Sequence, residues 1–105
     1  MTTATVLQVL GEPNRLAILD ALRGGERPVG ELVDAVHLSQ PAVSKHLRVL
    51  RDAGLVDVRP DAQRRMYRIR TEPLAALDEW LSTYRELWTT HLDLLEAHLE
   101  RRRTT

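Results

Sequence analysis

The fold of this 105-residue chain is decided by a stretch near its middle, which reads Leu38-Ser39-Gln40-Pro41-Ala42-Val43-Ser44-Lys45-His46-Leu47-Arg48-Val49-Leu50. Ser39 stands where a helix N-cap belongs, and Pro41 falls in the first turn, where its missing N–H costs little. Apolar residues recur at i, i+4 and i+7 from Val43, which predicts a buried stripe. The pattern therefore predicts a helix over residues 40–53, ended by Gly54.

A shorter helix is predicted just before this one, over residues 29–36, with His37-Leu38 as a tight connector. Two short helices joined by such a turn form a helix-turn-helix. Gln, Ser, Lys and Arg are residue types that contact base edges in the major groove, and a Pro ring can meet a thymine methyl group. Once the buried stripe is set aside, the outward positions of the second helix are Gln40, Pro41, Ser44, Lys45, Arg48 and Arg51.

Residues 55–70 predict a two-stranded hairpin, because residues 55–58 and 66–70 alternate in polarity and residues 60–63 are of types that favour turns. Arg64 and Arg65 lie at its tip. A basic hairpin beside a helix-turn-helix makes a wing, suited to DNA phosphates or the adjacent minor groove. The alternative is a tip that merely stays solvated. For Arg68 and Arg70 the solvent-facing and phosphate-binding interpretations both stay open.

A short helix with an apolar stripe is predicted over residues 3–10, and a further helix over residues 15–23. A long helix with a sustained apolar stripe is predicted from Leu74 to about Arg102. A lone chain cannot cover the distal part of the last stripe, so we expect a homodimer formed by the first and last helices. The expected interface residues are Val6, Leu7, Leu10, Leu77, Trp80, Leu81, Tyr84, Trp88, Leu92 and Leu95.

The zero net charge hides a segregation of charged residues. Residues 37–70 carry eight basic and three acidic side chains, a surplus of five positive charges, whereas residues 1–36 and 71–105 carry net charges of −2 and −3. A basic middle between acidic flanks suits a polyanionic partner.

The absence of Cys excludes disulfides, iron–sulfur clusters and thiolate-ligated zinc. Because no basic leader or membrane-length apolar run is present, we expect a cytoplasmic protein with no membrane partner.

The opening stretch, with Ala53-Gly54-Leu55-Val56 after it, closely resembles the ArsR/SmtB family of bacterial winged-helix repressors. Residues 10–19 resemble that family's junction between its first and second helices, and Arg65-Met66-Tyr67 its wing. The likeness covers residues 4–70 and is only general beyond them. It implies a homodimer that binds a palindromic operator on the bacterial nucleoid and represses transcription. The positions it implies for DNA contact are Ser39, Gln40, Pro41, Ser44 and Lys45, with Arg48 adjacent.

The sequence departs from the family where metals are sensed. The positions that correspond to the family's metal ligands hold no ordinary transition-metal ligand, and a long Trp-containing last helix resembles a metal-independent subgroup. We therefore expect no cofactor, and no small-molecule effector follows from the resemblance. These positions are Val33 and Ala35 in the third helix, and Thr71, Pro73, Tyr84 and Leu87 in or near the last.

Several residues allow more than one interpretation. His91 and His98, with Asp93 and Glu96 nearby, form a conceivable dimer-interface metal site, although such groups are common on exposed helices. Trp80, Tyr84 and Trp88 could line an effector pocket, but this spacing is more typical of packing. His46 is more typical of a packing residue than of a base-reading one.

A winged helix can also bind proteins; that function would need exposed apolar residues on the outer face of residues 40–53. Catalysis has no support, since Asp78 and Glu79 are adjacent and point apart, and no phosphate-binding loop is present.

The sequence thus predicts a mainly α protein with a small β-hairpin, a winged helix-turn-helix that binds DNA as a homodimeric repressor. Two symmetric copies predict an inverted-repeat operator. We expect a single domain over residues 1–105, with dimerisation helices at 1–10 and 74–103, the helix-turn-helix at 29–53 and the wing at 55–70.

Overall fold

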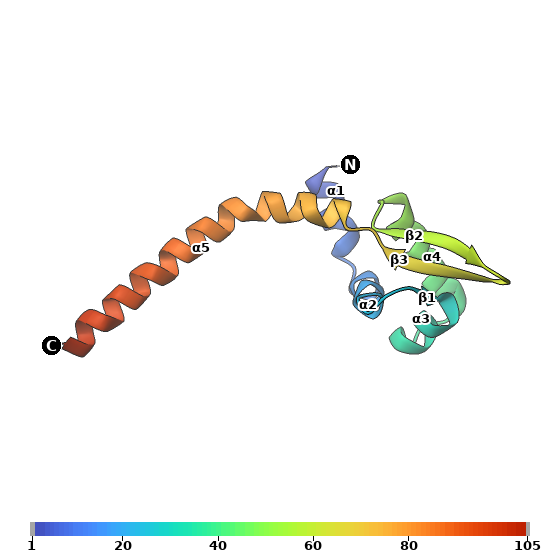
Figure 1. Cartoon of the computed structure of the whole chain (residues 1–105), viewed down its shortest axis with the longest axis horizontal. Coiled ribbons are helices and arrows are strands. Elements are labelled where there is room, and N and C mark those ends of the chain that lie inside the picture. The colour runs from blue at the N-terminus through green and yellow to red at the C-terminus, as the bar shows by residue number, and fades with distance from the viewer. Residues whose placement is uncertain (1, 105) are drawn as a thin grey trace.

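Five helices and a small antiparallel sheet build the chain in the computed structural model, which describes residues 2–104 (Figure 1). The predicted winged helix-turn-helix fold is confirmed. The helix bounds agree with the prediction to within two residues at every end, which is the usual uncertainty at helix termini. The elements are α1 (Thr3–Leu10), α2 (Pro13–Ala21), β1 (Arg27–Pro28), α3 (Val29–Val36), α4 (Gln40–Asp52), β2 (Val56–Asp61), β3 (Arg64–Ile69) and α5 (Glu72–Thr104).

The sheet has three strands in the order β1-β3-β2, whereas the sequence predicted two. The missed strand, β1, pairs with Tyr67 and Met66 of β3. Its two residues are too few to show alternation, which is why the pattern did not reveal it.

The hairpin turn is also tighter than predicted. Pro60 and Asp61 still pair with Arg65 and Arg64 of the neighbouring strand, so only Ala62 and Gln63 form the turn. Ala62 takes a φ of 56°, the left-handed conformation that two-residue hairpin turns require. Pro60 is tolerated in a strand because β2 is an edge strand.

The hydrophobic core lies between α2, α3, α4 and the base of the sheet. Leu32 of α3 is completely buried, and the α4 stripe of Val43, Leu47 and Leu50 is buried as predicted. In α2, Ile18 and Leu19 face the core, as does Leu22 at its C-cap, whereas the side chain of Leu16 is 46% exposed. The core therefore holds the apolar face of α4 and leaves the opposite face of the helix exposed.

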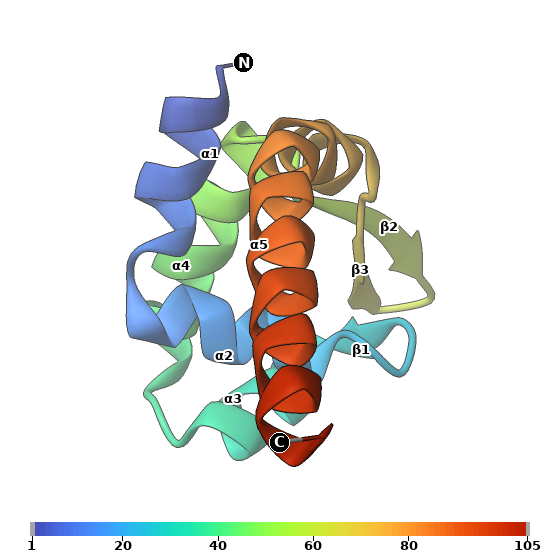
Figure 2. The same cartoon turned by 90° about the vertical axis from the view of Figure 1, so that its left-hand side faces the viewer.

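Helix α5 leaves the rest of the molecule (Figures 1 and 2). Its first turns pack on α1, where Leu74 and Leu77 are partly buried against the core. From Trp80 onward its large apolar side chains are exposed. The radius of gyration is consequently 19.2 Å, against about 13 Å for a compact domain of this length. No helix in the described part of the chain is long and apolar enough to cross a membrane.

Candidate nucleic-acid interface

The turn between α3 and α4 sets the orientation of α4. His37 ends α3 in the left-handed conformation, with φ 58° and ψ 40°, and its N–H donates to the Val33 carbonyl at 3.0 Å. Two residues later the Ser39 hydroxyl accepts a hydrogen bond of 3.3 Å from the Ala42 N–H and caps α4. The predicted N-cap is confirmed. The Ser39 hydroxyl is therefore engaged by its own helix.

The outer face of α4 carries the polar side chains singled out from the sequence. All are exposed, and they start at the helix N-terminus, the end that a recognition helix presents to bases. Val49 is also exposed, at 37%, near the far end of the helix. The structure brings together on this face Gln40, Pro41, Ser44, Lys45 and Arg48.

His46 does not belong to this face. Its side chain is half-buried, and Nδ1 lies 3.7 Å from Oε2 of Glu12. Glu12 in turn caps α2 by accepting a 3.0 Å hydrogen bond from the Arg15 N–H. His46 thus packs α4 against the start of α2, which confirms the packing interpretation.

The register of the wing divides its side chains between two faces. Asp57, Arg59 and Asp61 lie directly opposite Arg68, Met66 and Arg64, so these six residues share the outer face of the sheet. The other face carries Val58 opposite Tyr67, near the core, and then Pro60 opposite Arg65 toward the tip. Arg64 and Arg65 are neighbours in sequence but point to opposite faces.

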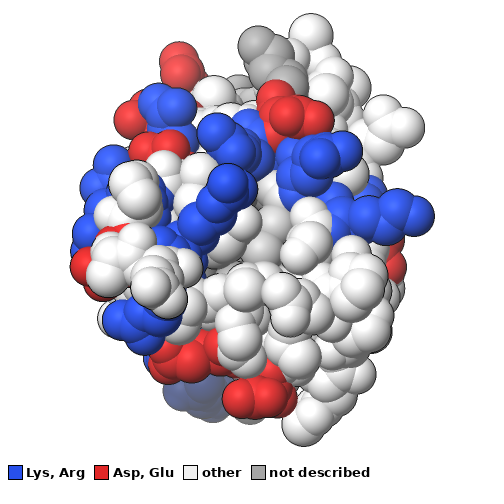
Figure 3. Space-filling model, turned by 90° about the vertical axis from the view of Figure 1, so that its right-hand side faces the viewer, with Lys and Arg blue, Asp and Glu red and all other residues white. Residues whose placement is uncertain are grey.

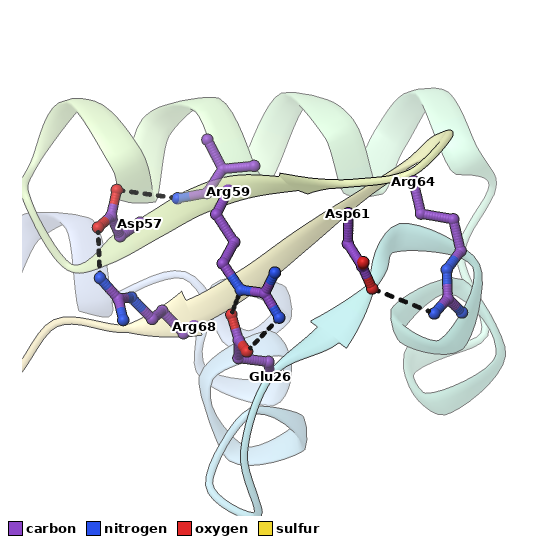
Figure 4. A network of polar contacts seen from close by, with 7 residues as sticks. Glu26, Asp57, Arg59, Asp61, Arg64 and Arg68 are labelled. Carbon is purple, nitrogen blue, oxygen red and sulfur yellow. Dashed lines mark hydrogen bonds and ion pairs between the residues drawn. The ribbon is translucent and has the colours of Figure 1, made fainter.

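Carboxylates neutralise the arginines of the outer face (Figure 4). Arg64 lies 3.6 Å from Asp61, and Arg68 lies 3.2 Å from Asp57. The hydrogen bond from Arg68, helped by the Val58 N–H, lowers the pKa of the Asp57 carboxyl.

Arg59 is neutralised by Glu26, at 2.7 Å, and Arg70 at the base of the wing pairs with Glu72 at 3.5 Å. Arg68 and Arg70, whose role the sequence left open, are therefore both in ion pairs. Among the described residues of the wing, Arg65 is the arginine that pairs with no carboxylate.

A groove separates the wing from helices α3 and α4, and its larger part is lined by α3 residues such as Glu31 and Asp34 and by Arg64 near the wing tip. It consists of two adjoining hollows of about 620 and 970 Å³, which share Ser44, Arg65 and Tyr67 in their walls. Arg48 and Arg51 of α4 line the smaller hollow. Figure 3 views this end of the molecule, where Lys and Arg side chains gather over the upper and left parts of the surface.

The residues of this groove that the sequence-based site omitted include Arg51, Gln63 and Tyr67. Arg51 was identifiable as outward-facing on its helix, but only the structure shows that it faces the wing. Gln63 and Tyr67 carried no comparable signal, because their placement depends on the tight turn and on strand register.

This arrangement has close counterparts among known proteins. The family model described as "Bacterial regulatory protein, arsR family" matches residues 12–58. The HTH-type transcriptional regulator Rv2034 of Mycobacterium tuberculosis is 42% identical over 85 residues, which cover 81% of this chain and 77% of that protein. The chain belongs to the ArsR family.

Two further relatives bear on the assembly and the extent of the chain. The solution structure of the homodimeric winged helix-turn-helix DNA-binding domain of Mb0332 from Mycobacterium bovis shares 31% identity at a TM-score of 0.63, covering 86% of this chain and 81% of that one. The transcriptional repressor SmtB of Mycobacterium tuberculosis is 43% identical over 70 residues. That match covers 67% of this chain and 52% of SmtB, so the chain spans about half the length of that relative.

The positions that hold metal ligands in the ArsR resemblance do not fit a transition metal here. Val33 is partly buried against the core, and Tyr84 and Leu87 are exposed; none of them offers a thiolate, imidazole or carboxylate. His91 and His98 are exposed on α5. Within residues 2–104, no three His, Cys, Asp or Glu side chains come together in a way that could hold a metal ion.

Proposed function

We propose that this ArsR-family chain is a homodimeric transcriptional repressor that recognises an inverted-repeat operator in double-stranded DNA. The observation that carries the proposal is the exposed polar face of α4, flanked by a groove into which Arg65 projects without a carboxylate partner. A recognition helix needs free hydrogen-bonding side chains at its N-terminus and cationic groups beside them for phosphates. The function belongs in the bacterial cytoplasm, on the nucleoid.

The roles on α4 follow from side-chain chemistry. Gln40 can donate to and accept from adenine, whereas Lys45 and Arg48 suit guanine or phosphate oxygens. Ser44 lies one turn after Gln40, in the wall shared by both hollows. Ser39 and Pro41 contact DNA at the start of the helix in this proposal, although the Ser39 hydroxyl also caps it.

The wing supplies phosphate contacts. Arg65 and Arg51 both line the smaller hollow, so a DNA backbone strand lying between α4 and the wing would meet both guanidinium groups. Arg64 lines the larger hollow, but it shares its charge with Asp61. We therefore assign the stronger phosphate contact to Arg65 and a weaker one to Arg64.

Dimerisation is proposed through α1 and α5. Exposed apolar side chains on α5 run from Trp80 to Leu99, and Leu7 of α1 is exposed beside the helix start. This surface is far larger than the scattered apolar residues normal for a monomer. Val6 already lies in the chain's own core, so it adds little to the interface. The α5 residues that face the partner copy in this proposal are Leu77, Trp80, Leu81, Tyr84, Trp88, Leu92 and Leu95, with Leu10 of α1 behind them.

A protein-binding role for the same face has less support. Such a face would expose apolar side chains along α4, whereas its exposed residues are polar or charged apart from Pro41 and Val49. The surplus of five positive charges over residues 37–70 also favours a polyanion.

The proposal is tested by selecting binding sites from random double-stranded DNA with the full chain. We expect enrichment of an inverted repeat whose half-site centres lie one duplex turn apart (roughly 34 Å), or a multiple of it. Binding should weaken steeply with salt, because several Lys and Arg side chains displace counterions. Enrichment of single half-sites would overturn the dimeric operator, and no enrichment at low salt would overturn DNA recognition itself.

A further inference from the structure

One ion pair joins the wing to the helical body across the outer face of the sheet. Arg59 of β2 donates from Nε to Glu26 Oε2 at 2.7 Å and from Nη2 to Glu26 Oε1 at 2.9 Å. Glu26 precedes β1, 33 residues earlier in the chain. The other outer-face pairs, Asp57 with Arg68 and Asp61 with Arg64, stay within the hairpin (Figure 4).

The position of this pair along the hairpin matters. Strand β1 supports β3 only as far as Met66, its last partner, and Arg59 lies directly opposite Met66 on β2. Arg65 is the next residue toward the tip. The Glu26–Arg59 pair therefore holds the hairpin at the level where main-chain support from β1 ends and the DNA-facing part begins.

The geometry of the pair suits a positioning role. Two parallel N–H···O bonds fix the direction of the guanidinium plane as well as its distance, unlike a single contact to a Lys ammonium. The hydrogen bond from Arg59 lowers the pKa of the Glu26 carboxyl, which keeps the pair ionised at neutral pH. Nearby charges are Arg68, which favours the Glu26 carboxylate, and Asp61, which favours the Arg59 cation.

We propose that Glu26 and Arg59 are positioning residues for DNA recognition, which set the angle of the wing and hence where Arg65 meets the DNA backbone. This inference rests on the proposed function. Neither residue needs to touch DNA. The role is distinct from thermodynamic stabilisation, because exposed ion pairs contribute little to folding.

The test compares Glu26→Gln with Asp57→Asn, a matched control. Both remove one negative charge near the wing and break one ion pair of its outer face, but only the Glu26 pair reaches the body. Affinity is measured for the duplex enriched by the wild-type chain and for a random duplex of equal length. We expect Glu26→Gln to weaken binding to the selected duplex at least about threefold relative to Asp57→Asn, with random-duplex affinity unchanged or raised.

Charge and folding effects would give different patterns of affinity. A pure charge effect strengthens binding to both duplexes in both variants, and loss of folded protein weakens both duplexes equally. Either pattern overturns the positioning role while leaving the proposed function intact. Failure of the wild-type chain to enrich any duplex instead overturns the proposed function, and this inference with it.

A charge swap and a DNA-independent measurement complete the test. Glu26→Arg and Arg59→Glu should each weaken selected-duplex binding, whereas the two together restore the pair and most of the affinity. Residual dipolar couplings of the free protein should show the hairpin changed or averaged in orientation relative to α4 in Glu26→Gln, and unchanged in Asp57→Asn. Wild-type orientation in both variants would overturn the inference.

Discussion

Helices α4 and α5 are both amphipathic, yet the apolar face of α4 is covered by its own chain and that of α5 is not. In α4 the apolar stripe is fully buried, and the exposed residues are polar or charged apart from Pro41 and Val49. In α5 the apolar side chains are themselves outside: Leu87 and Leu94 are each 66% exposed. The polar face of α4 is therefore available for a polar ligand such as DNA, whereas the apolar face of α5 requires an apolar partner.

Because of this difference, substitutions on the two helices should affect different properties of the protein. Changes on the buried side of α4 should act on the stability of each chain. Changes on the exposed apolar side of α5 should act on association, and changes on the polar side of α4 should act on DNA binding alone.

The largest effect is expected at the buried stripe of α4. Leu47→Ala should lower the free energy of unfolding by about 2–5 kcal/mol, because it leaves a cavity where the side chain is completely enclosed. Chemical denaturation measures this change. Val49→Ala, on the exposed side of the same helix, should cost less than about 1 kcal/mol. Similar costs for the two variants would contradict the burial of the α4 stripe.

The next largest effect is expected on α5 and concerns the association of two copies. Leu92→Glu should weaken dimerisation more than about thirtyfold, or about 2 kcal/mol, because a charge would enter an apolar interface. Sedimentation equilibrium measures the change. Ala97→Glu, on the opposite side of the helix, is the control and should leave the dimer intact. A wild-type chain that sediments as a monomer would contradict the proposed interface.

At the N-terminus of α4, Gln40→Ala should reduce discrimination between the selected duplex and one with changed bases by about 1–3 kcal/mol. Folding and dimerisation should not change, because the side chain is exposed. Competition binding with the two duplexes measures the difference. Equal weakening on selected and random DNA would show that Gln40 does not read a base.

In the wing, Arg65→Ala should weaken binding to all duplexes alike and reduce the salt slope by about one. Arg64→Ala is the control from the adjacent position; since Arg64 shares its charge with Asp61, its effect on the slope should be smaller. Titrations at several salt concentrations measure both slopes. A larger effect from Arg64 would reverse the assignment of the two arginines.

The smallest effect concerns pH. The pKa of Glu26 lies below its ordinary value of 4.5, chiefly because of the hydrogen bond from Arg59. A lowered folded-state pKa means that the stabilisation is present above the unfolded pKa and is lost as pH falls through the folded one. Wild type should therefore unfold at a slightly higher temperature than Glu26→Gln at neutral pH, and the difference should vanish in acid. A difference that grows as pH falls would contradict this linkage.

The sequence predicted most of the fold because its signals are local. The cap at Ser39 and the apolar stripe that follows lie within one stretch, so α4 could be placed almost to the residue. Strand β1 was not predicted, because a strand of two residues shows no alternation of polarity. The hairpin turn was predicted over too many residues, because Pro60, which lies in an edge strand, is a residue type typical of turns.

The candidate site was less predictable, because it depends on contacts between distant parts of the chain. The exposed face of α4 follows from helical spacing alone. The ion pair of Glu26 with Arg59 does not, since nothing in the spacing of these residues indicates that they meet. For the same reason the sequence treated Arg64 and Arg65 as equivalent, although strand register turns them to opposite faces.

The segregation of charge has a consequence for how two copies and DNA come together. At neutral pH two copies of a chain with equal numbers of acidic and basic groups repel each other very little at long range, so a dimer could form without a Coulombic barrier. The proposed dimer would still attract a DNA duplex to its basic surface, because attraction at short range depends on the local electrostatic potential rather than on the total charge. Self-association and polyanion capture are thus compatible in one small polypeptide.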